Sequence, residues 1–99
     1  IVGDGHQRRD FVYVGDICNA NITAALSDVN YEAYGQVYNV GTGTNVSVNQ
    51  IAKMIGGETT HLAPRPGEVR FSLANNQKIK RTFGWEPTMK LEDWIKENA

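Results

Sequence analysis

Residues 3–16 read GDGHQRRDFVYVGD and combine glycines, two arginines, an apolar run and an aspartate within 14 residues. A glycine turn comes first, because glycine accepts positive φ angles at no steric cost. Two adjacent arginines, Arg8 and Arg9, follow it. The aromatic and β-branched run at 11–14 predicts a buried strand, and Asp16 is placed to cap the helix that comes next. The stretch therefore predicts an anion-binding turn beside a βα junction.

The composition limits the class of protein. The chain has 99 residues, of which 40% are hydrophobic and 21% charged, as expected of one small globular domain or a piece of a larger one. The net charge of −1 provides no basic field for nucleic acid or an anionic membrane. No apolar run is long enough to span a bilayer. Because the chain begins at Ile1, inside an apolar run, we expect a piece of a longer protein.

Cys18 is the single cysteine, which excludes an internal disulfide framework and fits a reducing compartment. We therefore expect a cytoplasmic protein. Its place on the apolar face of the next predicted helix makes Cys18 a core residue by prediction.

The order of elements predicts an α/β fold. Apolar residues at helical spacing predict a helix over 17–26, and residues 37–40 form a second buried-strand candidate. With the strand at 11–14, this gives a right-handed βαβ unit. Ser47 followed by Gln50 is a capping-box pattern, which predicts a helix ending at the glycines 56–57.

The remaining elements are shorter. Residues 59–62 and 69–73 predict short strands. Asn75 is placed to cap a helix that runs through Phe83, and residues 91–98 predict a last helix.

The candidate site combines arginines from distant parts of the chain. Arg65 stands between two prolines and is followed by a glycine and Glu68. Guanidinium groups suit a diphosphate because their planar fork can bind two oxygens at once. Prolines lower the ordering cost of binding, and Glu68 could accept from ribose hydroxyls or orient an arginine. From composition alone, a solvated charge cluster is the alternative.

Other patterns predict no chemistry. Neither glycine pair, 3/5 or 41/43, has the third glycine that a dinucleotide-binding loop needs. His6 and His61 lack partners at metal-ligand spacing and are expected to be exposed. Asp10 beside Arg9 indicates a local charge pair.

The ordered motifs resemble those of extended short-chain dehydrogenase/reductases. They comprise the 3–16 stretch, YNVGTG at 38–43 with Ser47, RPGE at 65–68, and FGW at 83–85 followed by a proline. The resemblance covers essentially the whole chain. It points to NAD-dependent nucleotide-sugar epimerases and dehydratases, and most to the UDP-glucose 4-epimerase group.

The resemblance implies roles for five residues. Arg9 matches the family arginine that binds the substrate diphosphate, and Arg65 matches a second diphosphate arginine on the other side. Glu68 matches an acid that binds the nucleotide ribose. Val2 and Val48 match positions that line the base pocket, although core packing is the alternative for both.

The catalytic half of the family pattern is absent. No tyrosine has a lysine four residues later, and the glycine loop that holds NAD is missing. The resemblance therefore implies that residues 1–99 are the C-terminal substrate-binding region alone, with small strands and helices and a βαβ piece that joins the Rossmann sheet. NAD would be bound by the missing N-terminal domain, and the region alone would be inactive.

The expected partner is a nucleotide sugar, most of all a UDP-sugar, and the whole enzyme is expected to be a homodimer. Exposed apolar faces predict self-association of the isolated region. A nucleotide-sugar 4,6-dehydratase or reductase, or a stand-alone binding module without catalysis, are the alternatives.

Overall fold

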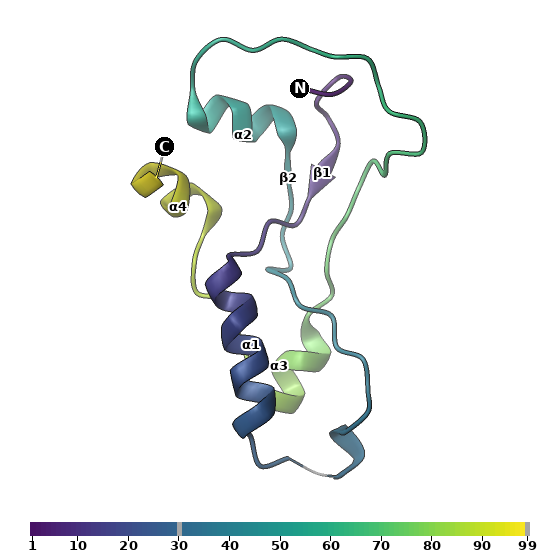
Figure 1. The fold of residues 1–99 in the computed structure, drawn as a ribbon, viewed down its shortest axis with the longest axis vertical. Helices are drawn as coiled ribbons and strands as arrows, with labels where there is room; N and C mark the ends of the chain where they lie inside the picture. The colour runs from purple at the N-terminus through teal and green to yellow at the C-terminus, as the bar shows by residue number, and fades with distance from the viewer. Residues whose placement is uncertain (30, 99) are drawn as a thin grey trace.

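The computed structural model describes residues 1–29 and 31–98 and has an α/β architecture (Figure 1). Its elements are β1 (Arg8–Arg9), α1 (Val14–Leu26), the 3-10 turn η1 (Tyr31–Ala33), β2 (Val46–Ser47), α2 (Val48–Ile55), α3 (Gln77–Phe83) and α4 (Leu91–Asn98). The two strands pair antiparallel, with Arg8 opposite Ser47 and Arg9 opposite Val46.

The main core lies at one end of the molecule, where α1 and α3 run side by side (Figure 1). Ala20 of α1, Ile79 of α3 and Trp85 are buried together. Tyr38 and Phe83 cover this cluster with an edge-to-face ring contact at 5.1 Å between centroids. At the other end α2 packs against α4, beside the N-terminus.

The molecule is flat and elongated, with extents of 51 × 33 × 15 Å and a radius of gyration of 16.4 Å. A compact domain of this length has a radius of gyration of about 13 Å. Much apolar surface is consequently exposed, and Leu26 and Val37 are each 81% accessible. We conclude that residues 1–99 bury only a thin core by themselves.

All four predicted helices are present, although α1 begins three residues earlier than predicted. The capping box at the start of α2 is complete, because Ser47 Oγ accepts from Gln50 N at 3.1 Å and Gln50 Oε1 accepts from Ser47 N at 2.8 Å. Gly56 ends α2, and Gly84 ends α3 in the left-handed conformation. The predicted cap at Asn75 is wrong by one position, because α3 begins at Gln77 and its N-cap is Asn76. Asn75 still accepts from the N–H of Gln77 at 3.1 Å.

The predicted role of Asp16 as a helix cap is wrong. Helix α1 begins earlier, at Val14, and places Asp16 within its first turn. The carboxylate is buried, with the residue 3% accessible, and accepts from Thr88 N (3.0 Å), Thr88 Oγ1 (2.6 Å) and Met89 N (3.1 Å). Its backbone carbonyl accepts from Trp85 Nε1 at 3.0 Å. Asp16 therefore fixes the segment leading to α4 against α1.

The four segments predicted as strands do not form strands in the described part of the chain. Residues 11–14 and 37–40 have no ladder partner, and the first segment runs into α1 instead. Residues 59–62 and 69–73 each form one isolated bridge. A strand requires a neighbouring strand for its backbone groups, and among the described residues neither of the first two segments has a backbone ladder partner.

Cys18 is exposed, so its predicted place in the core is wrong. The reason is that α1 turns its Asp16 and Ala20 side inward, and only these two α1 residues are buried. Among the described residues, no helix has the length and apolar character needed to cross a bilayer.

The Asp16 contacts predict a stability effect. Asp16→Asn should lower the free energy of unfolding by about 1–3 kcal/mol, because the amide group that replaces one charged oxygen of the buried carboxylate can no longer accept from the donors of Thr88 and Met89. Urea denaturation at pH 7 measures this change. Asp28→Asn, at an exposed aspartate, is the control and should have little effect; an equally small effect of Asp16→Asn would contradict the role assigned to this carboxylate.

Candidate functional site

Backbone hydrogen bonds join the N-terminal segment to the proline loop at two points. Gly3 N donates to Leu62 O at 2.8 Å, and Arg8 N donates to Arg70 O at 2.7 Å. Both pairings are parallel bridges. Residues 63–69 span the distance between the two points without pairing of their own, and we call them the arch. The arch is therefore held beside the glycine turn by its two ends.

The turn itself is fixed on the start of α2. Gly5 has a φ angle of +76°, and a Cβ there would overlap the side-chain amide of Asn49. Asn49 N donates to Gly5 O at 3.0 Å, and Asn49 Nδ2 donates to Asp4 O at 3.0 Å. His6 and His61 are exposed beside this turn, as predicted. Only glycine fits at position 5.

A hollow of about 220 Å³ lies between the turn and the arch. It brings together three of the predicted site residues, Val2, Arg65 and Glu68. The complete lining is Val2, Gly3, Asp4, Gln7, Pro64, Arg65, Glu68 and Arg70.

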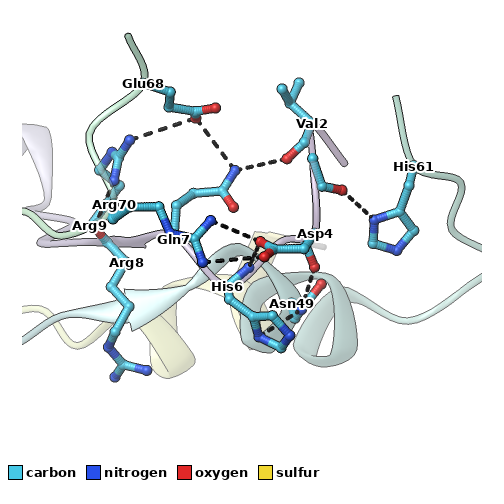
Figure 2. Close-up of polar contacts among 11 residues, drawn as sticks. Val2, Asp4, His6, Gln7, Arg8, Arg9, Asn49, His61, Glu68 and Arg70 are labelled. Carbon is cyan, nitrogen blue, oxygen red and sulfur yellow. Dashed lines mark hydrogen bonds and ion pairs between the residues drawn. The ribbon is translucent and has the colours of Figure 1, made fainter. Parts of the chain in front are cut away.

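Arg9 reaches the arch through an ion pair. Its Nη2 atom lies 3.6 Å from Glu68 Oε1, and the two side chains are 28% and 29% accessible. The same guanidinium donates to Arg8 O at 2.8 Å. Gln7 Nε2 contacts Glu68 Oε1 at 3.4 Å and Val2 O at 3.0 Å. Figure 2 shows Arg9 and Gln7 both pointing toward Glu68.

Arg8 and Arg9 do not form one positive patch. Strand alternation sends their side chains apart, and Arg8 points away from Glu68 (Figure 2). Arg8 donates instead to Asn45, from Nε to Oδ1 at 3.0 Å and from Nη2 to the carbonyl at 2.9 Å. The anion site predicted from both arginines is therefore reduced to Arg9.

Two predicted residues lie beside the hollow rather than in its lining. Arg9 lines a different cavity of about 420 Å³, with Thr42, Asn45 and residues of the α4 approach, and that cavity shares no lining residue with the hollow. Val48 begins α2, is partly buried, and donates its N–H to Gln7 O at 3.1 Å. Both residues thus contact the segment that lines the hollow.

An ion pair in the lining of the hollow was not predicted from the sequence. Arg70 binds Asp4 with two hydrogen bonds, at 3.0 and 3.2 Å (Figure 2). The guanidinium lowers the pKa of Asp4 to about 2, and the carboxylate raises the pKa of Arg70. The residues are 66 positions apart, and no local pattern links them.

Asp10 does not form the predicted charge pair with Arg9. Its carboxylate accepts from Thr42 N (2.9 Å), Thr42 Oγ1 (2.5 Å), Gly43 N (3.0 Å) and Ala74 N (3.3 Å). Burial raises the pKa of Asp10, but these hydrogen bonds outweigh it and the net pKa is lowered. Asp10, the residue next to Arg9, is therefore hydrogen-bonded both to the 41–44 loop and to the segment before α3.

No group of three or more His, Cys, Asp or Glu side chains gathers at metal-binding distance in residues 1–29 and 31–98. The hollow instead offers the guanidinium donors of Arg65 and Arg70, the carboxylates of Asp4 and Glu68, and the amide of Gln7. This set of groups can bind an anion and a neighbouring hydroxyl.

Known proteins with similar sequences and folds show the family. Residues 1–98 match the GDP-mannose 4,6 dehydratase family. The UDP-glucose 4-epimerase of Mycolicibacterium smegmatis is 33% identical over 96% of this chain and 31% of its own length. The UDP-glucose 4-epimerase of Thermotoga maritima, solved with UDP-glucose, is 39% identical with a TM-score of 0.83, over 97% of this chain and 31% of that one.

A third similar protein is MoeE5, solved with UDP-glucuronic acid and NAD. It is 30% identical with a TM-score of 0.86, over 97% of this chain and 33% of its own. This chain therefore belongs to the extended short-chain dehydrogenase/reductase family of nucleotide-sugar epimerases and dehydratases, as its motifs indicated. It spans about a third of the length of these relatives and matches their C-terminal part.

The Asp10 contacts predict how stability depends on pH. The folded pKa lies below the ordinary value of 3.8, so the carboxylate contributes stability that is present above 3.8 and lost as the pH falls through the folded pKa. Asp10→Asn should be less stable at pH 7 and should lose less stability than the unsubstituted protein between pH 5 and pH 3.

Urea midpoints measured across that pH range test this expectation. Asp93→Asn, at an exposed aspartate of α4, is the matched control and should keep the original pH dependence. An Asp10→Asn curve parallel to that of the unsubstituted protein would show that Asp10 is not a source of the acid sensitivity.

Proposed function

We propose that residues 1–99 are the nucleotide-sugar-binding region of an NAD-dependent epimerase, of the UDP-sugar 4-epimerase type. In this proposal Arg9 and Arg65 hold the diphosphate from two sides, and Glu68 accepts hydrogen bonds from the ribose. Val2 and Val48 line the pocket for the base. The intact enzyme would oxidise a sugar hydroxyl by hydride transfer to NAD and then reduce the ketone again.

The contact between Arg9 and Glu68, 3.6 Å across, is the observation that supports the proposal best. It supports the proposal because the residues proposed to bind the diphosphate and the ribose are neighbours, as the diphosphate and the ribose are in a nucleotide. Glu68 in turn shares its hollow with Arg65 and Val2. Glu68 thus contacts Arg9 and lines the same hollow as Arg65, which supports the proposal that both arginines act on one diphosphate.

The arch suits an anion that arrives from solution. Arg65 is exposed and lies between two prolines, which restrict the backbone and lower the cost of ordering the loop. A guanidinium at such a position can close on the diphosphate after the nucleotide enters. Binding energy from this unreactive part of the substrate would then position the sugar ring for the reaction.

The residues of this chain do not fit NAD. The sequence has neither a three-glycine loop after a strand nor a tyrosine with a lysine four residues later. We therefore assign NAD binding and hydride transfer to other parts of the full-length protein, and we expect residues 1–99 alone to be inactive. Their exposed apolar faces favour self-association of the isolated region, whereas the full-length protein is proposed to be a cytoplasmic homodimer.

A 4,6-dehydratase is the second candidate, and the match to the GDP-mannose 4,6 dehydratase family over residues 1–98 favours it. The two activities would use the same diphosphate site. They differ in whether the oxidised sugar is reduced directly or first loses water.

Substitution of Arg65 tests the proposed diphosphate site. In the full-length protein, Arg65→Ala should weaken UDP-glucose binding by about 2–5 kcal/mol, as expected when one member of a desolvated charge pair is removed. Isothermal titration calorimetry measures the change. Arg81→Ala, at an exposed arginine of α3, is the control and should bind normally; unchanged affinity in Arg65→Ala would remove this residue from the site.

A further inference from the structure

Gln7 is a buried polar residue in the wall of the hollow. It is 5% accessible, although it sits between the exposed His6 and the partly exposed strand β1. Its Nε2 atom donates to Val2 O at 3.0 Å and contacts Glu68 Oε1 at 3.4 Å, across 61 positions of sequence. Figure 2 shows the amide between these two groups.

The chemistry of the two partners fixes the orientation of the amide. A backbone carbonyl and a carboxylate are both acceptors, so the NH₂ group and not the amide oxygen must face them. Donation to both partners uses both hydrogens of the NH₂ group. The backbone of Gln7 is also held, because its carbonyl accepts from Val48 N at 3.1 Å. Gln7 is therefore a rigid donor facing the arch.

The anchoring is confined to one oxygen of Glu68. Gln7 and Arg9 both contact Oε1, and within the described residues no hydrogen bond or ion pair to Oε2 occurs. A glutamate on an exposed loop would otherwise move among many rotamers and lose that freedom only on binding. Holding Oε1 leaves Oε2 with a defined direction toward a hydroxyl donor.

We propose that Gln7 is a positioning residue that orients Glu68 for recognition of a ribose hydroxyl, and so makes the site discriminate against deoxyribose nucleotides. This inference rests on the proposed role of Glu68 in ribose binding. Gln7 does not touch the nucleotide in this proposal. It acts by holding the carboxylate in the geometry that the hydroxyl requires.

The quantity to measure is the discrimination ratio, defined as the affinity for UDP-glucose divided by the affinity for the deoxyribose analogue that binds more weakly. In the full-length protein, the affinity for UDP-glucose is compared with that for its 2′-deoxyribose and 3′-deoxyribose analogues. We expect the unsubstituted protein to bind UDP-glucose about tenfold to a hundredfold more tightly than the weaker analogue, as one hydrogen bond to a charged group provides. Glu68→Gln should lose most of this ratio.

Gln7→Met, which keeps the side-chain length and removes the donors, should also bring the ratio close to one. Its matched control is Gln36→Met, at an exposed glutamine far from the hollow, which should keep the original ratio. A Gln7→Met protein that binds all three ligands more weakly with an unchanged ratio would show a merely structural role and overturn the inference.

The outcomes separate the inference from the proposed function. If Glu68→Gln loses the ratio and Gln7→Met keeps it, the inference is wrong and the ribose role of Glu68 stands. If the unsubstituted protein does not discriminate, both are wrong.

If Gln7→Met does not fold, an NMR measurement on the unsubstituted protein tests the inference instead. The side-chain amide signals of Gln7 in NMR spectra should shift more with UDP-glucose than with the weaker deoxyribose analogue, and equal shifts would overturn the inference.

Discussion

The parallel backbone pairing between residues 1–8 and residues 62–72 is the constraint on which the candidate site depends. Two bridges, at Val2 with Leu62 and at Arg8 with Phe71, fix both ends of the arch beside the glycine turn. Without them, Arg65 and Glu68 would belong to a free loop. With them, a proline-stiffened segment faces residues that are about sixty positions away in the sequence.

The same pairing explains how the charged groups are distributed. Because Arg8 and Arg9 alternate along β1, only Arg9 can reach Glu68, and Arg8 is used by Asn45. Two aspartates stabilise the fold through hydrogen bonds. Asp10 accepts from the 41–44 loop, and Asp16 accepts from the segment that leads to α4. Their pKa values are lowered by hydrogen bonds that outweigh burial.

Local signals in the sequence predicted local structure well. The capping box at Ser47 and the glycine at 84 predicted helix boundaries, because caps depend on residues within one turn. The ordered motifs predicted the family and the C-terminal part of its fold. The strands at 11–14 and 37–40 were wrong for the chain by itself, because a strand depends on a partner that local sequence does not specify.

Long-range contacts could not be predicted for the same reason. Nothing near Asp16 indicates Thr88 as its partner, and nothing near Asp4 indicates Arg70. No local pattern indicates that Gln7 is buried against the arch. The roles of Arg9, Arg65, Glu68, Val2 and Val48 in binding remain predictions, and the structure provides the geometry in which they can be tested.

A crystal structure of the full-length protein with UDP-glucose tests the central claim most directly. The claim predicts a diphosphate between Arg9 and Arg65, with each guanidinium about 2.7–2.9 Å from a diphosphate oxygen and the Glu68 carboxylate on the ribose. A diphosphate bound elsewhere, with the two arginines directed to different sides of the molecule, would contradict it.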